Sequence, residues 1–136
     1  MIAPDTSVLI AALAPWHTSH AAAREALRGS EARLVAHVAF ETTSALSRMP
    51  EGLRIAPGVV LEAIVRRFPG AWLALDADRA RGALERAVAA GLRGGALYDA
   101  LIAATAAEHG AQLVSADRRA RRAYDAVGAS VSYVDG

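Results

Sequence analysis

Four acidic residues have neighbours that make an isolated charge costly: Asp5, Glu41, Asp99 and Asp117. Asp99 is the clearest case, because almost every position of residues 96–107 is apolar or small. An ionised carboxylate in such surroundings must be paired or must coordinate a metal. Carboxylate oxygens without thiolate or imidazole partners suit Mg²⁺ or Mn²⁺ better than Zn²⁺. The pattern therefore predicts a site for divalent cations, and such a site suits hydrolysis by metal-activated water.

Each of these residues also has an ordinary structural interpretation when it is taken singly. Asp5 and Asp117 follow apolar segments and precede helical ones, so either could be a helix N-cap. Asp99 could simply suit the dipole at the start of its helix. Glu41 could be a partly exposed helix residue paired with Arg48 or His37. The positions of the four side chains in the folded protein decide between these interpretations.

Short apolar segments alternate with helical patterns along the chain, which favours a parallel sheet with helices on both faces, the α/β class. The expected strands are residues 1–4, 33–36, 72–75, 112–115 and 130–134. Helices are expected over 6–13, 18–29, 38–49, 60–68, 76–88, 96–109 and 117–127, with apolar stripes that include Leu61, Val65, Leu84 and Val88. The 136 residues fit one domain spanning 1–136, with room for a real core.

This arrangement would bring the acidic residues together. In an open parallel sheet, ligands bind outside the carboxyl ends of the strands, where Asp5 and Asp117 are expected. Asp99 begins a helix, and helices begin at that same edge. Glu41 could approach from its own helix. Carboxylates this close repel one another, and no Lys is present to offset them.

The composition describes a globular chain with no strong overall charge. The sequence is 54% hydrophobic, carries a net charge of +1 and contains no cysteine, so a reducing cytoplasm is the expected location. No apolar run is long enough to span a membrane. Residues 8–14 superficially resemble the end of a signal peptide, but Asp5 and the lack of a preceding basic residue argue against one.

Four segments resemble the PIN-domain ribonucleases, and among them most closely the VapC toxins of bacterial VapBC toxin–antitoxin pairs. The segments are PDTSVLIA at 4–11, FETTSAL at 40–46, YDALIAAT at 98–105 and LVSADR at 113–118. The resemblance spans essentially the whole chain. Its departures are Pro4, where an aliphatic residue is usual, and Ser115, where threonine is common; neither removes an acidic residue.

The resemblance implies a three-layer α/β/α sandwich with a central parallel sheet. It makes Asp5, Glu41, Asp99 and Asp117 the catalytic, metal-binding acidic quartet. Asp5 and Asp99 would be the principal Mg²⁺ (or Mn²⁺) ligands, with Ser7 supporting Asp5 and Ser115 supporting Asp117. The implied activity is a toxin-type endoribonuclease, in which water attacks RNA and leaves a 5′-phosphate and a 3′-hydroxyl. A cognate VapB-type antitoxin and a second copy of the chain are the implied partners.

An acidic pocket repels phosphate, so basic residues must hold the RNA. Arg118, Arg121 and Arg122 follow the last acidic residue and are the candidates; a solvated helix face is the alternative. The apolar faces of 40–46 and 60–68 could be an interface for antitoxin or dimer, or simply core.

Three other functions remain in view. A catalytically silent RNA-binding module of the same fold would be expected to carry a broken quartet. A phosphatase or receiver domain would need paired aspartates at the first strand and a lysine. A DNA nuclease of the wider PIN class would normally be larger.

Overall fold

The computed structural model describes residues 1–29 and 31–135. In chain order its elements are β1 (Ile2–Pro4), α1 (Thr6–Leu13), α2 (His20–Leu27), α3 (Ala36–Ser47), α4 (Pro57–Arg67), α5 (Ala77–Ala89), α6 (Gly95–Glu108), β2 (Gln112–Ser115), a 3₁₀ turn (Arg118–Ala120), α7 (Arg121–Ala126) and β3 (Val131–Tyr133).

The three named strands form a parallel sheet in the order β1-β2-β3. Pro4 is in register with Val114, and Ser115 with Tyr133, so β1 and β2 end at the same edge. The amide of Asp5 extends the pairing by donating to the Val114 carbonyl at 2.9 Å. This register carries the chain into Asp5 and Asp117 on one side of the sheet.

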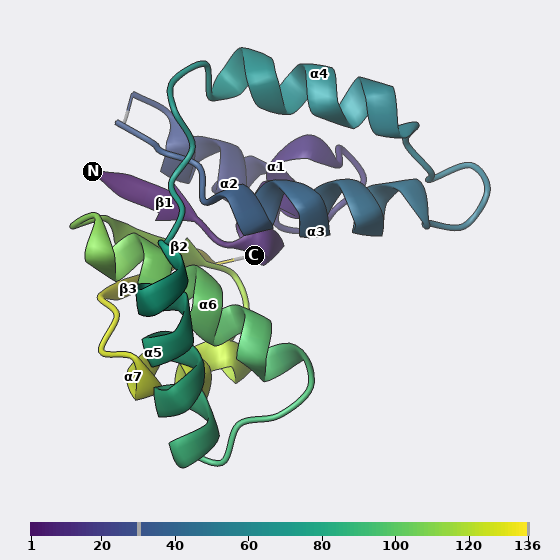
Figure 1. Ribbon diagram of the computed structural model, residues 1–136. Helices are drawn as coiled ribbons and strands as arrows, with labels where there is room; N and C mark the ends of the chain where they lie inside the picture. Colours follow the sequence, from purple (N-terminus) through teal and green to yellow (C-terminus); the bar gives the residue numbers. More distant parts are fainter. Residues whose placement is uncertain (30, 136) are drawn as a thin grey trace.

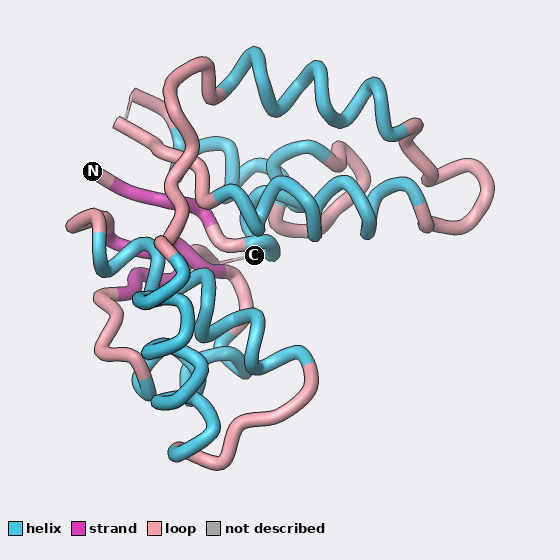
Figure 2. Tube along the Cα trace, viewed as in Figure 1, coloured by secondary structure: helices cyan, strands magenta, loops and turns pink. Residues whose placement is uncertain are grey.

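Helices cover both faces of this sheet, which confirms the expected α/β/α sandwich. α1 packs on β2 and contacts α2 and α3, and α3 in turn packs on α4. α6 packs on β2 from the other side and contacts α5 and α7. Figure 1 shows these two groups of helices, and Figure 2 shows the strands between them. Within the part of the chain that the structure describes, no helix is both long and apolar enough to cross a membrane.

α6 is the most deeply packed helix, as the small residues of its sequence predict. Its buried positions include Ala100, Ile102, Ala103, Ala104 and Ala106. Alanine side chains allow close approach of neighbouring elements, so this helix can lie between the sheet and two other helices. The consequence for function is that Asp99, one residue before this buried run, is held at a fixed place beside the core.

Two expected strands are absent as such. Residues 33–36 and 72–75 contribute only one isolated bridge, between Val35 and Leu73, and Ala32 forms another with Ile2. The segment before α3 is extended and buried at Leu34, but α3 already begins at Ala36. The extended segment is therefore too short to form a row of strand hydrogen bonds. These pieces continue the sheet beyond β1 by single bridges.

The apolar stripes of two helices are only partly buried in the core. In α4, Val60 and Ile64 are buried, whereas Leu61 and Val65 are each 50% exposed. In α5, Leu84 and Val88 are more than half exposed, while Ala83 and Ala87 are buried. The predicted 117–127 helix is divided into the 3₁₀ turn and α7. The exposed side chains leave apolar surface on α4 and α5.

Candidate active site

Asp5 is buried at the junction between β1 and α1. Its side chain is the N-cap of α1, and Oδ1 accepts the amide of Val8 at 3.0 Å. The residue is only 2% exposed. Among residues 1–29 and 31–135, no basic side chain forms an ion pair with it. The capping role anticipated for Asp5 is therefore present, but capping leaves its buried negative charge without a cationic partner.

The Ser7 hydroxyl joins the ends of β1 and β2. It donates to Asp5 Oδ1 at 2.5 Å and accepts the amide of Ala116 at 2.9 Å. Ser115, which directly precedes Ala116, has a similar role, because its Oγ accepts the amide of Asp117 at 3.0 Å. These two serines, anticipated as supporting residues, fix the backbone at the points where Asp5 and Asp117 leave the sheet.

Asp117 caps the 3₁₀ turn that follows β2. Its Oδ1 accepts the backbone amide of Arg119 at 3.0 Å and lies 3.2 Å from Arg119 Nε. The side chain is partly exposed and that of Arg119 is almost fully exposed, so this ion pair contributes little free energy. Asp117 is thus the most solvent-accessible of the strand-end acids and remains open to other ligands.

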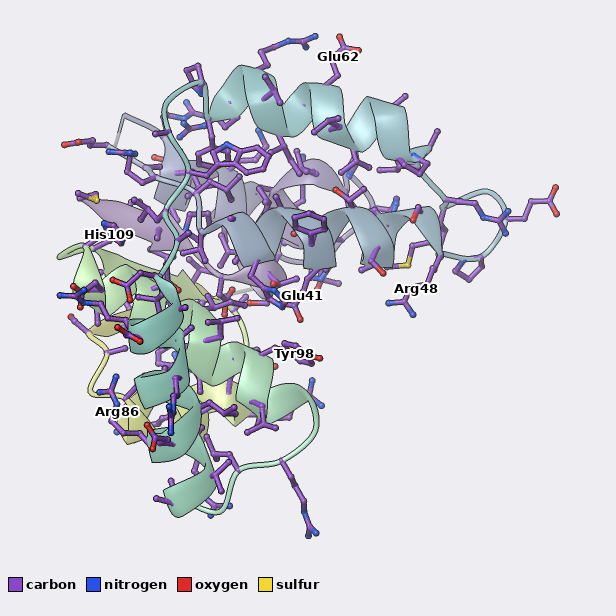
Figure 3. The ribbon with its side chains drawn as sticks, in the orientation of Figure 1. Glu41, Arg48, Glu62, Arg86, Tyr98 and His109 are labelled. Carbon is purple, nitrogen blue, oxygen red and sulfur yellow. The ribbon has the colours of Figure 1, made fainter. Side chains whose placement is uncertain are left out.

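Glu41 enters the site from α3. The Thr6 hydroxyl donates to its Oε1 at 2.7 Å, and His37 Nε2 lies 3.7 Å from its Oε2. The His37 ring stacks on Tyr98, with centroids 5.0 Å apart. In Figure 3, Glu41 on α3 and Tyr98 on α6 lie on the same side of the molecule, where the two groups of helices meet. Glu41 therefore faces the beginning of α6, next to Asp99.

The carboxylate of Asp99 interacts electrostatically with the other three. Burial raises the pKa of Asp99 to about 6, with further contributions from the negative charges of Glu41, Asp5 and Asp117. Among the described residues, no arginine or histidine pairs with it. Asp5, Glu41 and Asp117 therefore lie within electrostatic range of Asp99, although the four residues come from separate parts of the chain.

The donor chemistry of this cluster fits a hard divalent cation. Its side chains offer carboxylate oxygens, and the pKa of Asp99 is raised first by burial and then by the negative charges of the other three. Within the described residues, no group of three acidic or histidine side chains lies close enough together to bind one metal ion as it stands. Carboxylates in this arrangement repel one another, and a divalent cation of the Mg²⁺ or Mn²⁺ type would offset that repulsion.

Tyr124 of α7 is a site residue that the sequence reasoning missed. It is buried, and its hydroxyl donates to Asp5 Oδ2 at 2.5 Å. Burial and the charge of Asp5 both raise its pKa, so the phenol stays protonated and remains a donor. The available signal was a tyrosine on the apolar face formed by Ala120, Ala123 and Val127, since a buried phenol needs a polar partner.

The predicted arginines have different surroundings. Arg118 and Arg119 line an open depression of about 580 Å³ that also includes Ser7 and Asp117. Arg118 lies over the Tyr133 ring at 4.6 Å from its centroid. The other two candidates do not line this depression. Arg121 lies 3.7 Å from Asp125. Arg122 donates to the Ala90 carbonyl at 2.8 Å, which ties α7 to the end of α5.

Comparison with known proteins matches the chain to one protein family and to two named relatives. The family model described as PIN domain matches residues 2–126. Ribonuclease VapC40 of Mycobacterium tuberculosis is 43% identical over 134 residues, covering 98% of this chain and 99% of that protein. Ribonuclease VapC27 of the same species is 40% identical over 131 residues, covering 96% and 94%.

Solved structures share the fold at lower identity. FitAcB from Neisseria gonorrhoeae superposes with a TM-score of 0.70 at 24% identity and covers 96% of both chains. VapBC2 from Rickettsia felis, solved bound to a DNA fragment from their promoter, superposes with a TM-score of 0.67 at 19% identity, covering 99% of this chain and 100% of that one.

Proposed function

The chain belongs to the PIN domain family, and on that premise we propose that it is a metal-dependent endoribonuclease acting as the toxin of a toxin–antitoxin pair. The observation that carries the proposal is that Asp5 and Asp117 leave the parallel sheet at the same edge, where the Ser7 hydroxyl joins the two strand ends and Thr6 holds Glu41 beside them. The names of the two mycobacterial relatives, both ribonucleases, support the same activity.

In this mechanism the chain supplies a set of oxygen ligands. Asp5 and Asp99 would be the principal ligands, and Glu41 and Asp117 would complete the set. A bound Mg²⁺ or Mn²⁺ would lower the pKa of water and offset charge on the phosphate. Ser7 holds the carboxylate of Asp5, and Thr6 holds that of Glu41. The residues thus orient the attack of water on phosphorus, and the products carry a 5′-phosphate and a 3′-hydroxyl.

RNA approaches through the depression beside Asp117. Arg118 and Arg119 supply positive charge there, which offsets the repulsion between carboxylates and phosphate. Arg121 lies outside the depression, at the beginning of α7. The hydrogen bond of Arg122 to Ala90 favours a structural role for that residue. The RNA contact proposed for this stretch is therefore concentrated at its first two arginines.

A VapB-type antitoxin and a second copy of this chain are the proposed protein partners. Exposed apolar side chains on α3, α4 and α5 support such association, because Phe40 is 74% exposed and Val59 and Val88 are about 60% exposed. Apolar surface of this kind on a small protein marks interfaces. The placement of Rickettsia felis VapBC2 among the structural neighbours is consistent with an antitoxin partner.

The proposal is tested by incubating purified protein with RNA in Mg²⁺, in Mn²⁺ and in EDTA, and by mapping the RNA ends. We expect cleavage only with metal, and its loss in Asp5→Asn and Asp99→Asn variants that remain folded. Ends bearing a 2′,3′-cyclic phosphate would exclude water as the nucleophile. RNA binding without cleavage in any metal would instead identify a silent binding module.

A further inference from the structure

Tyr124 connects the last helix to the first acidic residue. It is 1% exposed, and its hydroxyl donates to Asp5 Oδ2 at 2.5 Å across 119 residues of sequence. The ring packs within the main hydrophobic core, so the hydroxyl is delivered to the carboxylate by a fixed scaffold. A flexible surface tyrosine could not hold such a position.

The other oxygen of Asp5 is also occupied. Oδ1 accepts the Ser7 hydroxyl at 2.5 Å and the Val8 amide at 3.0 Å. Donors from α1 and from α7 therefore hold the two oxygens from separate elements, and rotation of the carboxylate would break at least one bond. A carboxylate has about four acceptor positions, so three donors leave about one free for another ligand.

We propose that Tyr124 is a positioning residue that fixes the orientation in which Asp5 meets a divalent cation. The inference rests on the proposed metal-dependent function and extends it to a residue outside the acidic quartet. Groups that hydrogen-bond to a metal-ligating carboxylate orient it, and their removal weakens metal binding by about 10- to 100-fold. The hydroxyl, rather than the ring, performs this role.

The first test compares Tyr124→Phe with Tyr133→Phe, which removes the same atom from a tyrosine that packs under Arg118. Mn²⁺ binding is measured without RNA, from the electron paramagnetic resonance signal of free Mn²⁺. We expect the dissociation constant to rise at least about tenfold in Tyr124→Phe and to stay unchanged in Tyr133→Phe. Wild-type affinity in a folded Tyr124→Phe variant would overturn the proposal.

A second measurement needs no variant. Wild-type protein with ¹³C at tyrosine Cζ is titrated with Mg²⁺ and followed by nuclear magnetic resonance. The Tyr124 resonance should shift in step with binding, while the Tyr133 resonance stays in place. A stationary Tyr124 signal at saturating Mg²⁺ would contradict the proposal even if Tyr124→Phe failed to fold.

Neither measurement contains RNA, so this inference and the proposed function fail separately. Wild-type protein that binds Mn²⁺ but cleaves no RNA would refute the ribonuclease, while weakened binding in Tyr124→Phe would still support the positioning role. Wild-type protein that binds neither Mn²⁺ nor Mg²⁺ would refute both.

Discussion

The Thr6 hydroxyl donates a 2.7 Å hydrogen bond to Oε1 of Glu41, and this bond joins the first turn of α1 to the middle of α3. Thr6 directly follows Asp5, so two consecutive residues contribute to the site in different ways. The first supplies a carboxylate and the second orients another.

Replacing Thr6 with valine should reduce RNA cleavage by about tenfold, since it removes a bond that orients a proposed metal ligand while keeping the shape of the side chain. Thr6→Ser should retain most activity. The matched control is Thr43→Val, because that hydroxyl donates to the Ala39 carbonyl of its own helix. Equal losses in Thr6→Val and Thr43→Val would argue that the effect is one of general stability.

Asp99 should make the metal-free protein less stable as pH rises. Its pKa is raised from 3.8 to about 6, mainly by burial and then by the three neighbouring carboxylates. The native state therefore holds this proton more tightly than the unfolded chain does. The resulting contribution to the free energy of unfolding is complete below about pH 3.8 and is lost as pH rises through about 6.

Asp99→Asn should consequently melt at a higher temperature than wild type at pH 8 in EDTA, and the difference should shrink at pH 5. Thermal unfolding followed by circular dichroism measures both. Glu51→Gln, in the exposed loop before α4, is the control and should change neither melting temperature. A variant that melts below wild type at pH 8 would mean that the Asp99 charge is already compensated.

Divalent cations should stabilise the wild-type fold. A ligand that binds only the native state at 100 times its dissociation constant adds about 2.7 kcal/mol to the free energy of unfolding. The melting temperature should therefore rise with Mg²⁺ or Mn²⁺ concentration and return to its starting value in EDTA. Asp99→Asn should show little of this rise, and an equal rise in that variant would place the metal elsewhere.

Arg118 should contribute to the salt dependence of RNA binding. Its guanidinium lies over Tyr133 and 3.5 Å from Asp135, at the depression beside Asp117. If it contacts one phosphate, Arg118→Gln should reduce the slope of log K against log salt by about 0.7, the value for single strands. Fluorescence anisotropy with a labelled RNA, in Ca²⁺ or in an inactive Asp5→Asn background, measures the slope.

Arg122→Gln is the contrasting variant in this series. Its guanidinium donates to the Ala90 carbonyl, so its loss should lower thermal stability and leave the salt slope unchanged. A flattened slope in Arg122→Gln, with none in Arg118→Gln, would reverse the assignment and favour the turn of α7 as the RNA contact.

The sequence was sufficient to predict the helices and strands that border the site. β1, α1 and β2 were predicted because each combines an apolar segment with a clear terminal signal, such as Pro15 after α1 or Gly110 before β2. The parallel sheet then placed Asp5 and Asp117 at one edge. The positions of α3 and α6 relative to the sheet were the further information needed to place Glu41 and Asp99 in the site.

The remaining errors arise where tertiary packing decides. The segments around Val35 and Leu73 are apolar and extended, yet each pairs through a single bridge, which no local pattern distinguishes from a strand. The exposure of Leu61 and Leu84 depends on which helices lie nearby. The bond from Tyr124 to Asp5 joins residues 119 positions apart, and periodicity within one helix carries no information about such a contact.

The parallel pairing of β1 with β2 also determines when the site can exist during synthesis. Ile2 pairs with Gln112, so the first strand remains without this neighbour until Gln112 has been synthesised. Asp5 emerges from the ribosome long before Asp117. The four carboxylates therefore cannot come together until the segment that carries Asp117 has been made.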